Sequence, residues 1–302
     1  QMLSGSHMYI AGAMTKTASS AFDVSTTTPS YVYYNSINPQ SVLSTNYHHL
    51  ILSNTGAKTA GGAVTVNGDI TLAIGSTFNA GAFSHTVSGN WINNGTFNHG
   101  NGTVTFTGGA NTSITGATTF HTLGLNKTSA NHNVALNNEV VAANLQMTNG
   151  DIVTGSNKVT LLGNRTGNGW VVGTLTRSHA FAAGTAYAFN GPHAQLTFAA
   201  PAGVNEVTVV TSPQSVSGFT VGTPINRKYT VTIPAGTYES ASLQLQYRDA
   251  ELNGNDESVL KLYQYDSGLA RWRTYGRTSL NGTENWVSRT ALADVSGEWV
   301  LS

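Results

Sequence analysis

Acidic and amide side chains near the C-terminal end of the chain are the group best suited to bind a metal ion. The segment DAELNGNDE spaces oxygen donors around Gly254, and the candidate ligands are Asp249, Glu251, Asn253, Asn255, Asp256 and Glu257. This spacing resembles a calcium-binding loop, in which carboxylate and amide oxygens surround the ion. Leu260 stands where such a loop has a bidentate glutamate, and both flanks have strand-like sequences. We therefore expect a polar turn, with a structural calcium ion as the alternative and no other cofactor.

Catalysis on a polysaccharide would need two carboxylates close together. In the repeat region defined below, the only acids are Asp69, Glu139 and Asp151. Asp69 and Asp151 share the motif NGDI, in which a turn aspartate is expected to bond its own backbone. Glu139 and Lys158 are 19 residues apart, which predicts a surface ion pair between neighbouring turns of the repeat, with Lys127 close by. The sequence thus predicts no catalytic residues and no enzyme.

The histidines have no spacing typical of a metal site. His48 and His49 are adjacent, so in a strand they would point to opposite faces. The others in the repeat region follow no fixed period, and we expect exposed polar positions for His85, His99, His121 and His132.

Aromatic and threonine residues offer two further binding surfaces. A sugar could stack on an exposed ring, although most of the large aromatic residues are expected in the core; they include Trp91, Trp170, Tyr187, Trp272 and Trp286. Threonine runs such as TVTFT at Thr103–Thr107 could form a flat outward ladder of the kind that ice-binding solenoids use. We expect neither an aromatic row nor a carboxylate pair on the outward face of the repeat.

Charge is scarce and balanced. The 302 residues include 14 Lys+Arg and 14 Asp+Glu, and no charged residue lies between Asp69 and Lys127. A neutral chain lacks the basic patch that nucleic acid requires, and no apolar run approaches the ~20 residues needed for membrane insertion. There is no cysteine, which excludes disulfides and thiolate chemistry and is compatible with an extracellular location.

The charge-poor region repeats with a short period. Val66, Val87, Phe106, Leu125 and Leu145 recur at intervals of 19 to 21 residues, between Gly and Asn turn signals. Such a period is typical of a solenoid, in which stacked turns bury a continuous column of side chains. In-register stacking tolerates hydroxyl and amide side chains better than like charges, which repel. We therefore predict an all-β chain: a parallel β-solenoid (β-helix) with rungs of about 19–21 residues, followed by an antiparallel β-sandwich.

The expected boundaries follow composition. Residues 1–8 contain GSHM, typical of an expression-tag remnant. The remaining predicted segments are N-terminal capping strands at 9–46, the β-solenoid at 47–176, a connection at 177–193 and the β-sandwich at 194–302. In the last segment, alternating strands such as QLTFAA and NRKYTVTIP are joined by short turns.

These stretches, with INRKYTVT and DAELNGNDE as the most distinctive, resemble secreted, adhesin-like surface proteins of Bacteroidetes and Chlorobi-type bacteria. The resemblance implies display at the cell surface, with no catalytic residues to carry over. We expect a non-catalytic adhesion module, in which a stiff solenoid displays or supports a β-sandwich and the partner is a glycan or another surface protein. The alternatives are a carbohydrate-binding module, a polysaccharide-active β-helix protein and, more remotely, an ice-binding surface.

Overall fold

The computed structural model describes residues 4–15, 24 and 29–302. Within them the chain is all-β apart from two short 3-10 helices, η1 (Asp249–Glu251) and η2 (Glu257–Val259). The chain divides into two compact units, Gln1–Val159 and Thr160–Ser302. No helix in the described residues has the length and apolar character needed to span a membrane.

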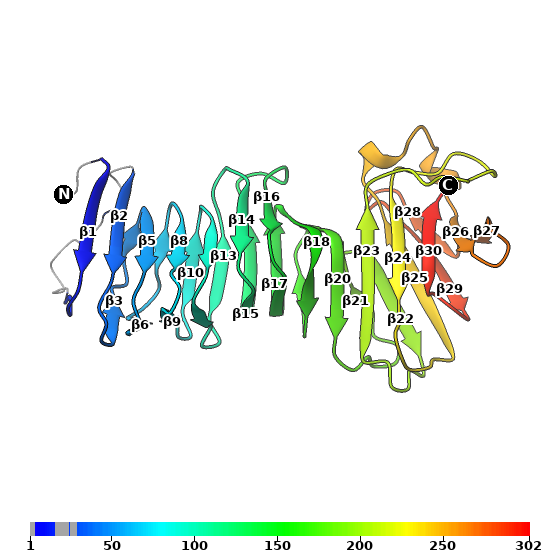
Figure 1. Cartoon of the computed structure of the whole chain (residues 1–302). Coiled ribbons are helices and arrows are strands. Elements are labelled where there is room, and N and C mark those ends of the chain that lie inside the picture. The colour runs from blue at the N-terminus through cyan, green and yellow to red at the C-terminus, as the bar shows by residue number, and fades with distance from the viewer. Residues whose placement is uncertain (1–3, 16–23, 25–28) are drawn as a thin grey trace. The chain divides into compact units, whose positions relative to one another are not determined.

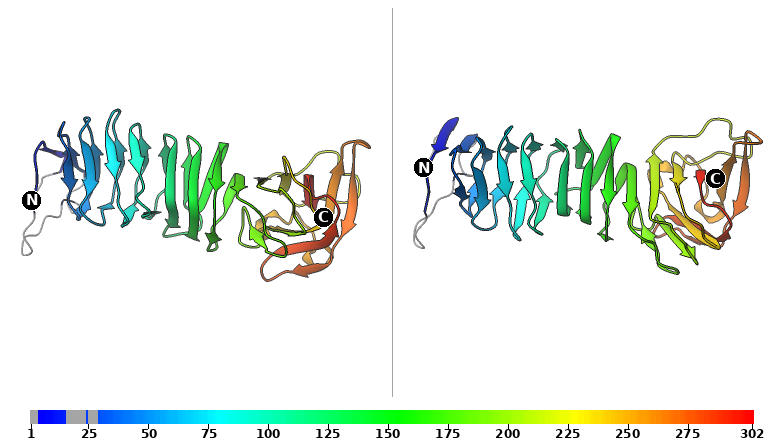
Figure 2. Two further views of the ribbon diagram at one scale, coloured as in Figure 1. Left: turned by 90° about the horizontal axis from the view of Figure 1, so that it is seen from below. Right: turned by 60° about the horizontal axis from the view of Figure 1, so that its bottom comes forward.

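The first unit is a parallel β-solenoid of about 8 turns, as predicted (Figures 1 and 2). Its turns stack strands into three parallel ladders. One ladder contains β1 (Ser6–Ile10), β2 (Ser30–Tyr34), β5 (His49–Leu52), β8 (Ile70–Leu72), β11 (Trp91–Asn93), β14 (Thr112–Thr115), β16 (Asn133–Leu136) and β18 (Asp151–Leu161). The second contains β4 (Asn46–Tyr47), β7 (Thr65–Val66), β10 (Ser84–Val87), β13 (Thr103–Phe106), β15 (Thr118–Asn126) and β17 (Val140–Asn149). The third is the four-stranded sheet of β3 (Gln40–Val42), β6 (Ala57–Ala60), β9 (Thr77–Asn79) and β12 (Thr96–Asn98).

The predicted apolar column exists and runs through the second ladder. Val66 pairs with Val87, Val87 with Phe106, and Phe106 with Leu125. All of them are buried. Side chains at paired positions point to the same side of the ladder, and here that side is the interior of the solenoid. The predicted last member of the column, Leu145, is two positions away from the observed one. Leu125 pairs with Met147, and Leu145 pairs with Leu123. Leu125 and Met147 are 22 residues apart, whereas Phe106 and Leu125 are 19 apart, so the repeat lengthens between β15 and β17.

Both predicted ends of the solenoid need correction. β1 and β2 fall in the segments expected to be a tag remnant and capping strands, yet β1 pairs in parallel with β2, and β2 with β5. The parallel ladder therefore begins before Tyr47. The parts of those segments at 1–3, 16–23 and 25–28 lie outside the described residues. At the other end, β20 (Val171–Ser178) pairs antiparallel with β23 (Glu206–Ser212), so the antiparallel unit starts before Thr176.

The second unit is the predicted antiparallel β-sandwich. One of its layers is β20, β23, β24 (Lys228–Thr232), β30 (Gly297–Leu301), β26 (Leu262–Asp266) and β27 (Arg271–Gly276). The facing sheet is β21 (Tyr187–Ala188), β22 (Gln195–Ala199), β25 (Ser240–Gln246), β29 (Trp286–Leu292) and β28 (Ser279–Asn281). Alternate residues of both sheets form the core, among them Phe198, Val209, Val231, Leu243 and Leu245, all nearly without solvent exposure.

Candidate functional site

The hydroxyl face is a regular outward surface on the second ladder of the solenoid. It consists of Thr65, Ser84, Thr86, Ser88, Thr103, Thr105 and Thr107. β10 with the residue after it reads SHTVS, and β13 reads TVTFT, so every second position is a hydroxyl while the residues between them are buried. The strand period therefore sorts hydroxyls outward and apolar groups inward.

The register aligns these hydroxyls across strands. Ser84 pairs with Thr103 and Thr86 with Thr105, and Thr65 pairs with Thr86 on the preceding turn. The hydroxyls of Ser88 and Thr107 are 2.9 Å apart and share a hydrogen bond. Sheet geometry sets the repeat at about 4.8 Å between strands and about 6.6 Å along them. The result is a two-dimensional array of hydroxyl-bearing side chains.

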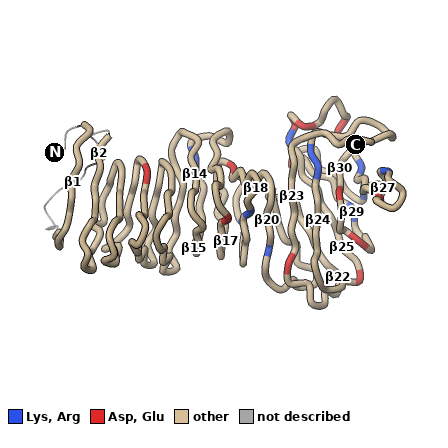
Figure 3. Tube along the Cα trace, in the orientation of Figure 1, with Lys and Arg blue, Asp and Glu red and all other residues tan. Residues whose placement is uncertain are grey.

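No charged side chain is contributed by the strands of this array. Between Asp69 and Lys127 the sequence has none, and Figure 3 shows how few charged residues the first unit carries. Lys127, which we expected close to Glu139 and Lys158, is buried: its Nζ donates to the carbonyl of Thr107 at 2.8 Å and to the hydroxyl of Thr112 at 3.1 Å. Burial lowers the pKa of this ammonium group.

A second outward feature, an aromatic stack, lies on β1, β2 and β5 and contradicts our expectation of no aromatic row. His7, Tyr31 and His49 stack in register, with ring centroids 4.7 and 4.6 Å apart and interplanar angles of 16° and 7°. Tyr9 and Tyr33 form a parallel stack beside them, at 4.5 Å and 17°. The rings cover one another's faces and turn their edges outward. A sugar stacks on a ring face, so most of this row offers no platform for it.

The other aromatic residues behave largely as predicted. Trp91, Trp170 and Trp272 are buried, and Tyr187 and Trp286 are half-buried. The ring of Trp170 is covered within the protein, because the guanidinium groups of Arg227 and Arg248 lie over it, 4.5 and 4.9 Å from its centroid.

The acids of the solenoid are not brought together. Glu139 and Lys158 form the predicted exposed ion pair, with Oε1 and Nζ 3.9 Å apart. Asp69 does not close its own turn as predicted. Its Oδ1 accepts hydrogen bonds from the backbone N–H of Asn90 at 2.7 Å and from its amide at 3.0 Å, linking two turns. Asp151, its counterpart in sequence, is buried.

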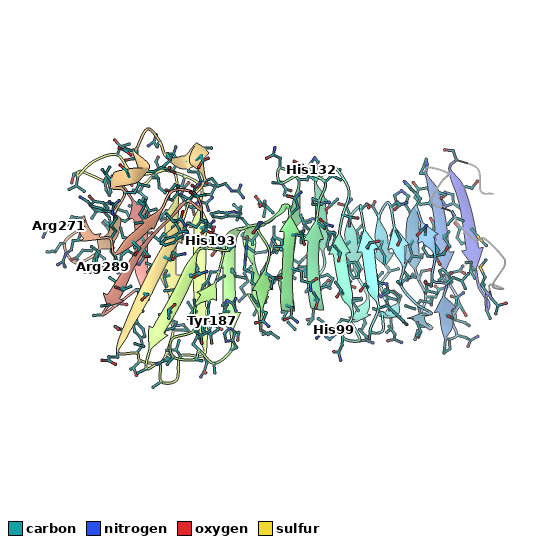
Figure 4. All side chains as sticks on the ribbon, turned by 180° about the vertical axis from the view of Figure 1, so that it is seen from behind. His99, His132, Tyr187, His193, Arg271 and Arg289 are labelled. Carbon is teal, nitrogen blue, oxygen red and sulfur yellow. The ribbon has the colours of Figure 1, made fainter. Side chains whose placement is uncertain are left out.

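The histidines do not assemble a metal site in the described residues, where no group of three or more His, Asp or Glu side chains converges. His99 and His132 lie on opposite edges of the solenoid in Figure 4. His85 corrects our expectation of exposure: it is buried, its Nδ1 accepts from the backbone N–H of Val64 at 3.2 Å, and its Nε2 donates to the carbonyl of Ala80 at 3.0 Å. It faces inward because it alternates with the outward Ser84 and Thr86.

The candidate calcium ligands point into separate contacts. Glu251 accepts hydrogen bonds from the buried Arg227 and from the backbone N–H of Arg248. Asn253 donates to the carbonyl of Pro224, and Asn255 to that of Leu252. Of the remaining three, Asp249 accepts from the amide of Asn285, Asp256 accepts from the backbone N–H of Ser258, and Glu257 begins η2. No three acidic or histidine side chains converge in this part of the described chain. These residues lie in a connection with two 3-10 helices between β25 and β26.

Comparison of the chain with protein-family models, with curated proteins and with solved structures found no significant match.

Proposed function

We propose that this chain is a non-catalytic extracellular module that adheres to an ordered, uncharged, hydroxylated surface through the hydroxyl face of its solenoid. The single observation that supports the proposal is the in-register array on β10 and β13, which carries no charged residue. An adhesion role also agrees with the resemblance to secreted surface proteins.

The chemistry of the array favours a rigid ligand over a soluble one. A hydrogen bond exchanged with water contributes only about 0.5–1.5 kcal/mol net, so a single hydroxyl binds little. A fixed array can add several such bonds without ordering its own side chains, because threonine has few rotamers to lose. Only a ligand that repeats in two dimensions can use all of them. Insoluble polysaccharide is an extracellular material that meets this description.

Sedimentation with microcrystalline cellulose and with crystalline chitin tests the proposal. Thr105→Lys places a long charged side chain in the middle of the β13 row of the hydroxyl face, and it should abolish co-sedimentation with whichever polymer the unaltered chain binds. Thr96→Lys is the matched control, because Thr96 is an exposed threonine on β12 in the other sheet. If neither polymer retains the chain, or if both variants bind equally well, the proposal fails.

Ice is a second candidate, favoured by one specific observation. Thr65, Thr86 and Thr105 pair in register on three successive turns and form one column of threonines. The same pair of variants serves here, with inhibition of ice recrystallisation as the measurement. Loss of inhibition in Thr105→Lys alone would assign the face to ice.

A further inference from the structure

The second unit contains a cleft of about 390 Å³ that the hydroxyl face does not explain. One side is the loop Gln214–Gly218, and the others are formed by Lys228 on β24, Tyr265 on β26, Trp272 on β27 and Glu298 on β30. Pockets for small organic ligands begin at about 300 Å³. The space suits one or two sugar rings.

Charge in the cleft is balanced by an ion pair. Lys228 Nζ and Glu298 Oε1 are 2.6 Å apart, and their side chains are 24% and 38% exposed. Each keeps hydrogen-bonding capacity, since an ammonium group has three donors and a carboxylate about four acceptor sites. A phosphate or a metal ion would have to displace one partner of the pair. A neutral ligand with hydroxyl groups could bond to both without separating them.

The half-buried ring of Tyr265 supplies the aromatic surface of the cleft, and the buried Trp272 packs against it. The ring centroid of Trp272 is 5.4 Å from that of Tyr265 and 5.8 Å from that of Phe219. The indole N–H donates to the carbonyl of Ser217 at 3.5 Å, which connects the ring to the loop. Aromatic rings are suited to the C–H faces of sugars because they combine a rigid apolar surface with polar edges.

Several polar side chains along the cleft have unused hydrogen-bonding capacity. Within the described residues, the hydroxyl of Tyr265, the amide of Gln214 and the hydroxyl of Ser215 make no side-chain hydrogen bond to the protein. Donors and acceptors thus surround an apolar wall. This combination matches a molecule that alternates hydroxyl groups with C–H surfaces.

We propose that this cleft binds the terminal one or two rings of a neutral saccharide, with Lys228 and Glu298 bonding its hydroxyls and Tyr265 contacting its apolar face. This site is independent of the hydroxyl face: it lies in the other unit, takes a soluble ligand and depends on different residues. Failure of one proposal leaves the other standing.

Isothermal titration calorimetry on the full chain tests it. The probes are methyl glycosides of glucose, galactose, mannose and N-acetylglucosamine, their disaccharides, and glucuronic acid as an acidic comparison. At least one neutral probe should bind, and Tyr265→Ala and Glu298→Gln should each weaken it at least tenfold. Tyr265→Phe, which keeps the ring, should weaken it less than Tyr265→Ala.

Glu284→Gln is the matched control, because Glu284 faces His193 with Nδ1 and Oε2 3.8 Å apart, among the residues of a different cleft. It should bind as the unaltered chain does. Unchanged circular dichroism shows that each variant is folded. The proposal is overturned if no neutral probe binds, if the acidic sugar binds more tightly, or if the cleft variants retain full affinity.

Discussion

Arg227 and Glu251 form an ion pair in the interior of the second unit, where Arg227 Nε donates to Glu251 Oε2 at 2.7 Å. Arg227 is 1% exposed, and its guanidinium also lies over the ring of Trp170. The pair joins the start of β24 to η1, the helix within the segment that had suggested a calcium loop.

Breaking this pair should destabilise the second unit strongly. Glu251→Gln leaves the Arg227 charge buried without its partner, which costs about 3–5 kcal/mol. Urea denaturation followed by tryptophan fluorescence would measure this loss. Arg273→Met removes the exposed partner of Asp266 and should change the midpoint little. Equal effects from both substitutions would contradict the importance of burial.

Calcium should not stabilise the chain. The Glu251 carboxylate already bonds Arg227, so a cation at this turn would compete with a buried guanidinium. Thermal unfolding with millimolar calcium and with a chelator should give the same Tm. If calcium bound the folded chain, a calcium concentration of 100 times the Kd would raise the free energy of unfolding by about 2.7 kcal/mol, which is easily detected as a higher Tm. Such a rise would restore the calcium alternative.

Acidification should destabilise the first unit through His85. Burial lowers the pKa of His85 below its ordinary value of 6.5. The unfolded chain therefore takes up a proton that the folded chain resists, and stability is lost as the pH falls through about 6.5. Burial also lowers the pKa of His49, with a further contribution from His48, so it acts in the same direction.

The variant His85→Phe should show a flatter dependence of unfolding free energy on pH between 7.5 and 5. It should also be less stable at pH 7.5, because the Val64 N–H and the Ala80 carbonyl lose their partner, at about 1–3 kcal/mol for each buried group. An unchanged slope would assign the pH dependence to other groups.

Gly116 should be irreplaceable in the turn before β15. Its φ is +86°, and a Cβ there would lie 1.8 Å from the carbonyl oxygen of Asn93 on the preceding turn. Gly116→Ala combines backbone strain of about 1–2 kcal/mol with a clash against backbone that cannot move aside. Gly155→Ala is the control, since Gly155 has φ +58° with open space around it. The free energy of unfolding should fall further for Gly116→Ala, and the reverse order would be inconsistent with this close approach of turns.

Charge placed on adjacent turns should reveal why the solenoid excludes it. Thr86→Asp combined with Thr105→Asp puts like charges directly opposite each other, whereas Thr86→Lys with Thr105→Asp puts opposite charges there. Cross-strand pairs contribute about 0.2–1 kcal/mol, so the like-charged double variant should be less stable by about that amount. The difference, measured by denaturation at low salt, should shrink in 1 M NaCl. If both double variants unfold at the same denaturant concentration, stacking does not account for the missing charges.

The sequence alone determined the fold class and much of the solenoid core. The recurrence of Val66, Val87, Phe106 and Leu125 predicts a stacked column because alternation and period are local properties of a strand and its turns. The absence of charge points the same way, since stacked like charges repel. Tertiary structure decided the rest. Whether Leu125 meets Leu145 or Met147 depends on how β15 and β17 extend, which no local pattern encodes.

Partners distant in sequence were likewise decided only by folding. DAELNGNDE shows oxygen donors but not that Glu251 turns toward Arg227, and the cleft joins a loop to four strands that are dispersed along the chain. The outward hydroxyls of β10 and β13 belong to both categories. The sequence shows that these hydroxyl residues alternate with buried ones, whereas their alignment into one array depends on the register between turns.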